Sequence, residues 1–342
     1  MLNVVVNNAF RLIGTPVNVK VKERLANLSK IKAYSRIGKE LTFPLDLAKN
    51  LKKPNRTLDT VQQAISLLNT PNEFLKYSLF WIYTITPEQQ QAAEFLAKGD
   101  LKSAEKIYRP CSDFASIISY STSLFIAKRD NQAIKILTKF TANDKLKDEF
   151  TSFVSELNGQ PIELTTEELL GLQLDALLDS YQPYDLLKIY TSINKSDKIP
   201  FYNNIETIIN EKNAKKLLKK IESAIKSMET LINLDLAKAF HTCDKLIETC
   251  RVDLRYLEKS MGDTTEFRNA GDNLAKCILR CSTAYHNKSE DPSFNSIKKS
   301  LSLLKKIKNF AHSNMILADI DRGINTLREI LSIDEDDFIF PF

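Results

Sequence analysis

The chain has 342 residues, of which 43% are hydrophobic and 27% are charged, and its formal net charge at pH 7 is +5. This length accommodates two or three domains, the composition excludes an intrinsically disordered chain, and so mild a charge does not by itself indicate nucleic-acid binding. With only 8 Gly and 11 Pro, the chain lacks the turn residues of a many-stranded sheet, so we expect an all-α protein.

Neither a membrane span nor a secretory signal is predicted. The most apolar run, YSLFWIYTI at 77–85, is about half as long as a bilayer span, and we expect a buried helix there. The start, MLNVVVNNAF, lacks the basic and apolar segments of a signal peptide. Five cysteines, an odd number without a dense framework, agree with a reducing compartment, so we expect a cytoplasmic protein.

The first 86 residues predict a small helical unit. A short helix is expected at 8–14 and a longer one at 19–37, followed by a Pro-containing loop at 38–55. The helix expected at 57–69 has apolar residues at the i, i+3, i+4 and i+7 positions of a one-sided helix: Val61, Ala64, Ile65 and Leu68. The helix after it is expected to contribute Phe74, Leu75, Leu79 and Trp81.

Three helix starts carry the same capping pattern. Thr70, Thr86 and Thr165 are each followed three positions later by Glu or Gln. In such a capping box the hydroxyl accepts one backbone N–H, and the later side chain accepts the N–H of the threonine. Pro directly follows Thr70 and Thr86, at the first helical position, where its missing N–H is not needed. We therefore expect helices to begin near 71, 87 and 166.

A weak internal repeat follows residue 86. Segments 96–108 (LAKGDLKSAEKIY) and 126–137 (IAKRDNQAIKIL) share a small residue, a polar turn centred on Asp and the pattern Ala-x-Lys-Ile, at a spacing of about 30 residues. This self-similarity resembles that of tetratricopeptide repeats, whose period is about 34 residues. We expect TPR-like helix hairpins over residues 87–200.

The last third of the chain predicts long antiparallel helices. Two helices separated by Gln182-Pro183 are expected at 165–193, and Lys198-Ile199-Pro200 breaks the pattern before the long helices begin. The next helix repeats apolar residues at spacings of three and four, as in a coiled-coil seam: Leu236, Phe240, Cys243, Ile247, Cys250, Leu254 and Leu257. A similar stripe follows at Leu274, Cys277, Ile278 and Cys281, and two more helices are expected over 293–331.

Motifs of the first 80 residues occur in a characteristic order. The helix expected at 19–37 is rich in Lys and Arg and is called the basic helix below. It is preceded by Phe10-Arg11-Leu12-Ile13-Gly14 and followed by a PLDL…NRT loop. The unit ends with Leu68-Asn69-Thr70-Pro71 and Phe74-Leu75-Lys76-Tyr77. This order resembles a DnaJ-type J-domain, and more specifically divergent bacterial J-like proteins in which TPR-like helices follow. The resemblance covers residues 8–137 most closely. It implies a helical module that docks on a DnaK-type chaperone.

The loop after the basic helix departs from the J-domain pattern. J-domains carry His-Pro-Asp there, and the resemblance implies that this motif triggers ATP hydrolysis by the DnaK-type partner. This chain has no His before His241 and reads Phe43-Pro44-Leu45-Asp46 at that place. The basic helix still offers charge for docking onto an acidic surface, although a solvated helix face explains its lysines as well. We expect docking without ATPase stimulation.

Catalytic and metal motifs are not found in the sequence. It contains no Walker A, dinucleotide-binding, G-x-S-x-G, H-E-x-x-H or C-x-x-C motif. The sharpest metal candidate combines His241, Cys243 and Cys250 with Cys277 and Cys281. Since each of these cysteines lies in an apolar stripe, we favour core packing. We expect neither catalysis nor a metal or other cofactor.

Lysine-rich stretches and the C-terminus leave a second possibility open. Segments 212–220 (KNAKKLLKK) and 298–308 (KKSLSLLKKIK) lack interleaved aromatics, which favours solvated helix faces over nucleic-acid binding. The end, SIDEDDFIFPF, resembles the acidic Pro-Phe tip of bacterial single-stranded-DNA-binding proteins. This tail either docks onto its own chain or inserts into a partner.

These patterns predict an all-α protein with a J-like module at 1–86, TPR-like hairpins at 87–200, a long-helix antiparallel domain at 201–331 and an acidic-aromatic tail at 332–342. We expect it to bind other proteins, as a chaperone-associated adaptor or scaffold whose partner is a DnaK-type chaperone or a client. The alternatives are an accessory protein of nucleic-acid metabolism and an unrecognised enzyme. The residues expected to contact a partner are Lys20, Lys22, Arg24, Lys30, Lys32, Arg36, Pro44, Asp46, Asp336, Asp337, Phe338, Phe340, Pro341 and Phe342.

Overall fold

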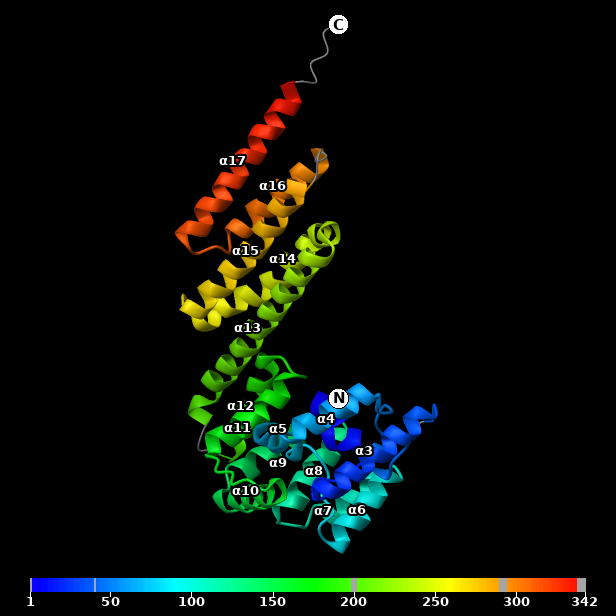
Figure 1. Ribbon diagram of the computed structural model, residues 1–342. Coiled ribbons are helices and arrows are strands. Elements are labelled where there is room, and N and C mark those ends of the chain that lie inside the picture. Colours follow the sequence, from blue (N-terminus) through cyan, green and yellow to red (C-terminus); the bar gives the residue numbers. More distant parts are fainter. Residues whose placement is uncertain (1, 40, 198–201, 289–293, 337–342) are drawn as a thin grey trace. The chain divides into compact units, whose positions relative to one another are not determined.

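The computed structural model describes residues 2–39, 41–197, 202–288 and 294–336, and these residues form helices without any strand (Figure 1). The all-α prediction is confirmed. The chain divides into two compact units, residues 1–209 and 210–342, each with its own apolar core. The boundary expected between 86 and 87 lies inside the first unit.

The first unit contains twelve described helices and one 3₁₀ turn. In chain order these are α1 (Asn3–Val6), α2 (Ala9–Ile13), α3 (Val21–Arg36), the 3₁₀ turn η1 (Pro44–Asp46), α4 (Leu58–Leu68), α5 (Pro71–Ser78), α6 (Pro87–Ala97), α7 (Leu101–Tyr108), α8 (Phe114–Ile126), α9 (Asp130–Thr141), α10 (Asp144–Asn158), α11 (Thr166–Leu178) and α12 (Pro183–Asp197). The helices expected at 8–14, 19–37 and 57–69 are therefore confirmed as α2, α3 and α4.

The predicted helix starts at 71, 87 and 166 are also confirmed, but only two of the three capping boxes form. Thr86 with Gln89 and Thr165 with Glu168 make both reciprocal bonds. Thr70 makes no side-chain cap. Its backbone N–H already donates to the Leu67 carbonyl at the end of α4, so Glu73 has no N–H to accept and pairs with Lys76 instead.

Both repeat segments fold as helix hairpins. The first joins α6 to α7 and the second joins α8 to α9. Each turn contains one residue with positive φ, Gly99 at +83° and Lys128 at +59°, which reverses the chain within three residues.

Most of the apolar run at 77–85 is buried, but it is not the helix that we expected. The helix α5 ends at Ser78, and Leu79, Phe80, Trp81, Ile82 and Tyr83 follow as irregular backbone with almost no exposure. Side chains and backbone from elsewhere satisfy its polar groups: the Tyr83 N–H donates to Ser119, Phe80 accepts from Asn8, and Ile82 accepts from the Val17 N–H. Bonds to distant residues thus replace helical ones.

The second unit is an antiparallel bundle of long helices. After α13 (Tyr202–Leu234) come α14 (Leu236–Met261), α15 (Thr265–Lys288), α16 (Phe294–Lys308) and α17 (Asn314–Asp336). Tyr256 donates to Asn210 between α14 and α13, and the Phe240 and Tyr285 rings stack 4.1 Å apart between α14 and α15. The predicted apolar stripes face inward, and Cys243, Cys250, Cys277 and Cys281 are buried among them.

Candidate functional site: a basic helix and its supporting loop

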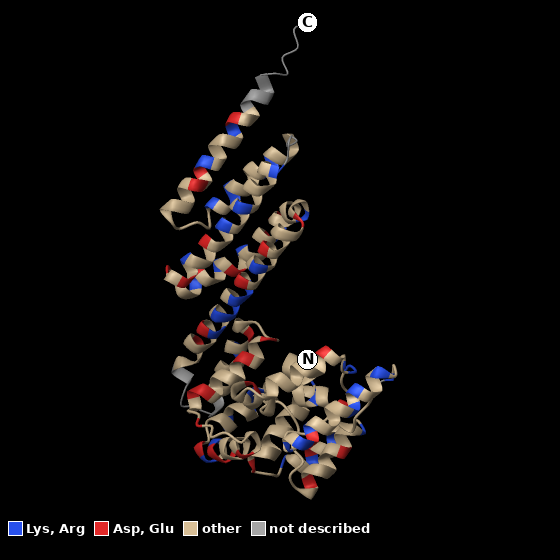
Figure 2. Ribbon diagram, viewed as in Figure 1, with Lys and Arg blue, Asp and Glu red and all other residues tan. Residues whose placement is uncertain are grey.

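Helix α3 presents most of its surface to solvent. Of its 16 residues only Arg24 and Ile31 are buried. Lys20, which precedes the helix, is exposed, as are Lys22, Lys30 and Arg36, while Lys32 is half-buried. Glu23 is the acidic residue of the helix, so the exposed charge is predominantly positive (Figure 2).

The same helix exposes large apolar side chains between its cations. Val21, Leu25 and Tyr34 are more than two-fifths exposed, and Ile37, just after the helix, is 65% exposed. Scattered single apolar residues are ordinary on a surface, but several along one helix give α3 an exposed surface that mixes apolar and basic side chains. Such a surface suits a partner that offers both apolar contact and negative charge.

Arg24 does not belong to this exposed face. It is 4% exposed, and its guanidinium carbon lies 5.0 Å from the centre of the Phe74 ring of α5. Burial lowers the pKa of Arg24 from its ordinary value. We expected a docking residue here, but the side chain anchors α3 to the unit, because the helix turns this position toward α5.

Asp46 is likewise internal. It is 3% exposed and forms an ion pair with Arg56, whose Nη1 donates to the carboxylate at 2.7 Å. The carboxylate also accepts the Phe43 N–H at 3.0 Å, which closes the η1 turn. A partner contact through the Asp46 side chain, as expected from the sequence, is therefore not available in this structure.

A second arginine completes the cluster beneath the loop. Arg11 of α2 is fully buried and donates to the Asp46 carbonyl at 2.7 Å and the Lys52 carbonyl at 2.6 Å. Burial lowers its pKa to about 10, which leaves it charged at neutral pH. Arg56 in turn donates to the carbonyls of Leu12 and Arg11 at 2.8 Å. Two guanidinium groups thus tie the loop to α2.

The motif residues Gly14 and Phe43 fit the same arrangement. Gly14 ends α2 with φ at +73°, and a Cβ at this position would lie 2.2 Å from the Phe43 ring. The Phe43 ring in turn lies 4.9 Å from the Arg56 guanidinium. Phe43 therefore packs as a structural residue. Pro44, by contrast, is exposed and lines a shallow groove with Ala93 of α6.

Sequence reasoning missed Arg11 and Arg56 as partners of Asp46. Both belong to the motifs noted above, FRLIG and NRT, so a signal was present. Their separation of 35 and 10 residues from Asp46 has no helical or strand periodicity, and the pairing becomes visible only in the folded chain.

Most of the tail residues that we expected to contact a partner lie outside the described residues. Asp336 is the last residue of α17, and its side chain is not described. Asp337, Phe338, Phe340, Pro341 and Phe342 lie outside the described residues.

The remaining sequence candidates, the cysteine cluster and the lysine-rich stretches, belong to the second unit. Within the described residues, no group of three or more His, Cys, Asp and Glu side chains is placed to hold a metal ion. Nor do the described residues include a helix that is long and apolar enough to cross a bilayer. In the lysine-rich stretches, Lys220 pairs with Asp253 at 2.7 Å, and Lys306 and Lys308 pair with Asp244 and Asp321 at 2.6 Å.

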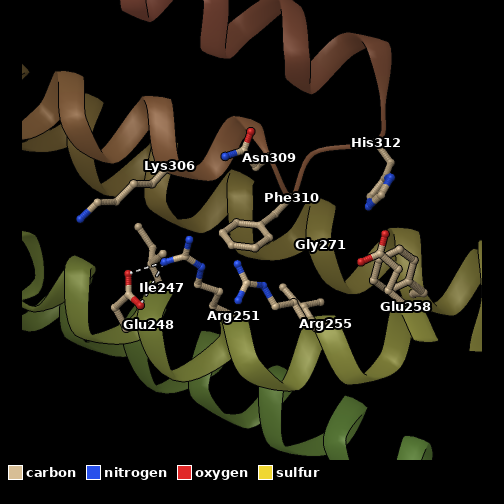
Figure 3. A pocket seen from close by; sticks show the side chains of 12 residues that line it. Ile247, Glu248, Arg251, Arg255, Glu258, Gly271, Lys306, Asn309, Phe310 and His312 are labelled. Carbon is tan, nitrogen blue, oxygen red and sulfur yellow. Dashed lines mark hydrogen bonds and ion pairs between the residues drawn. The ribbon is translucent and has the colours of Figure 1, made fainter. Parts of the chain in front are cut away.

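One pocket of the second unit was not foreseen. It lies between α14 and the turn that joins α16 to α17, and Figure 3 shows Arg251 and Arg255 of α14 pointing toward the ring of Phe310. Lys306, from the lysine-rich stretch 298–308, also lines the pocket. Two arginines one helical turn apart were the available signal.

Comparison of the chain with protein-family models, with curated proteins and with solved structures finds no match.

Proposed function

We propose that this protein is a non-catalytic interaction protein, a chaperone-associated adaptor or scaffold that docks an acidic surface of a partner on helix α3. The observation that carries the proposal is the exposed combination of Lys20, Lys22, Lys30 and Arg36 with large apolar side chains on α3. Complementary charge steers the encounter, and the apolar side chains contribute the desolvated contact. By resemblance to the J-domain, the partner is a DnaK-type chaperone.

The loop after α3 supports docking without stimulation of the ATPase. The chain has Phe43 where J-domains have the imidazole of His-Pro-Asp. The carboxylate of Asp46 is held by Arg56 and by the Phe43 N–H, so it is engaged in holding the loop together. Neither side chain is then free to act on a bound chaperone. The non-catalytic assignment rests on the sequence, which lacks recognisable catalytic motifs.

The test is to measure binding of the full-length protein to a purified DnaK-type chaperone. A variant with Lys20, Lys22, Lys30 and Arg36 changed to Glu is expected to bind at least about tenfold more weakly at low salt. The matched control changes four exposed cations of the same unit, Lys102, Lys106, Arg109 and Lys145, to Glu, so that net charge is equal. The control is expected to bind like the wild type.

ATP turnover by the chaperone is measured in the same samples and is expected to stay at its basal rate. Stimulated ATP turnover contradicts the proposal. So does a binding affinity that falls equally in the α3 variant and in the control variant. Salt-sensitive binding of the wild type to single-stranded DNA in place of the chaperone would establish the nucleic-acid alternative.

A further inference from the structure

The pocket between α14 and the α16–α17 turn combines an apolar floor with exposed cations. Ile247, Leu254 and Phe267 are buried and line it together with Phe310. Arg251, Arg255 and Lys306 lie at its rim (Figure 3). The pocket is concave, and its lining suits one aromatic side chain together with neighbouring carboxylates.

Two residues of α15 hold the wall of this pocket in place. At Gly271 a Cβ would lie 2.2 Å from the Phe310 carbonyl oxygen, so only glycine lets the turn approach α15 this closely. The next residue, Asp272, accepts the N–H groups of His312 at 2.7 Å and Ser313 at 3.1 Å. The turn that carries Phe310 is thereby fixed without a ligand, which lowers the ordering cost of binding.

The charges of the pocket are only partly compensated. Arg251 lies 3.4 Å from Glu248 in an exposed pair, Lys306 pairs with Asp244, and Glu258 also lines the site. Arg255 has no hydrogen-bond or ion-pair partner among the residues that the structure describes. Arg251 and Arg255 repel one another across one helical turn. A bound carboxylate would relieve this repulsion and pair Arg255.

The chain itself contains a segment with the complementary chemistry. Residues 334–337 are Asp-Glu-Asp-Asp, and residues 338–342 are Phe-Ile-Phe-Pro-Phe. Carboxylates match the two guanidinium groups, and a phenylalanine matches the apolar floor, where its ring also meets the guanidinium groups in a cation–π contact.

The tail cannot reach the pocket of its own chain. The pocket residues Phe310 and His312 directly precede α17, whereas the tail leaves from the other end of this helix. With 23 residues, α17 is about 34 Å long. The six residues after Asp336 span about 21 Å when fully extended. The acids at 334–336 belong to α17 itself and are farther still from the pocket.

We propose that this pocket binds the C-terminal segment 334–342 of a second copy of the chain. A phenylalanine of the segment occupies the apolar floor, and its carboxylates pair with Arg251 and Arg255. The contact joins the tail of one copy to the pocket of another. A dimer forms if two copies exchange tails reciprocally, and a longer assembly forms if they do not. This interaction goes beyond the proposed function, since it uses no residue of α3.

The test is sedimentation velocity of the full-length protein over about a hundredfold range of concentration. The wild type is expected to associate as concentration rises. The variants Arg251→Glu/Arg255→Glu, and a chain that ends at Asp336, are expected to associate at least about tenfold more weakly. The matched control Lys276→Glu/Arg280→Glu reverses two cations at the same spacing on α15 and is expected to behave as the wild type.

Exchanging the charges of the tail and of the pocket shows whether a loss of association comes from a lost specific contact or from misfolding of the variant. A chain with residues 334–337 all changed to Lys is expected to be monomeric alone, as is the Arg251→Glu/Arg255→Glu chain, but a mixture of the two is expected to associate. A wild type that stays monomeric over the whole range overturns the proposal. So does association that survives the pocket variant, or a mixture that does not associate.

Discussion

Asp46 lies buried in the loop after α3, where it pairs with Arg56. From the sequence we expected it to contact a partner. In the structure its carboxylate is buried against Arg56, and its backbone carbonyl accepts from Arg11. A buried carboxylate with two guanidinium groups around it is a structural charge, because removing it leaves both cations without compensation.

Replacing Asp46 by Asn is therefore expected to destabilise the first unit by about 3–5 kcal/mol. The comparison is Asp59→Asn, which removes an exposed carboxylate in the first turn of α4 and is expected to cost less than about 1 kcal/mol. Denaturant unfolding of the full-length variants measures both. Equal stability of the two variants would show that the buried pair contributes little.

At the scale of single helices, the three Thr caps show which features of a helix start a local sequence pattern predicts. All three have the same pattern, and all three mark a helix start. The capping bonds form at Thr86 and Thr165, where the backbone N–H is free to meet the Gln or Glu side chain. At Thr70 the preceding helix has taken that N–H, so the pattern predicts the boundary but not the bond.

Alanine substitutions distinguish these caps. Thr86→Ala and Thr165→Ala are each expected to lower the free energy of unfolding by about 0.5–2 kcal/mol, because orphan N–H groups lose their acceptor. Thr70→Ala is expected to cost distinctly less. Thermal unfolding of the three variants provides the ranking, and a Thr70 variant as unstable as the other two would refute the assigned bonds.

At the scale of the whole molecule, the apolar residues form two separate cores, one in each unit. The first is rich in aromatic side chains, several of them in edge-to-face pairs such as Phe10 with Phe74. The second consists mainly of Leu, Ile and Cys from long helices. Since each unit has its own core, a packing defect in one is expected to leave the other stable.

Gly271→Ala tests this independence. Its Cβ would collide with the rigid Phe310 carbonyl, so a loss of about 1–3 kcal/mol is expected in the second unit. Gly323→Ala is the control, because its Cβ would meet only the ends of the Leu304 and Leu279 side chains, which can move. It is expected to stay within about 1 kcal/mol of the wild type. Hydrogen exchange of the full-length protein measures the stability of each unit separately. Faster exchange in α4–α9 of the Gly271 variant would contradict separate cores.

Local sequence patterns are enough to predict the all-α class, the starts of three helices, the two hairpins and the inward stripes of the long helices. These features depend on caps, turn residues and apolar spacing, which act within a few residues along the chain. The folded chain is needed to see that Arg24 and Asp46 are internal, that residues 79–83 are buried without being helical, and that Arg251 and Arg255 line a pocket with Phe310. Each of these depends on partners tens of residues away, and no local pattern encodes which distant groups will satisfy a charge or a backbone N–H.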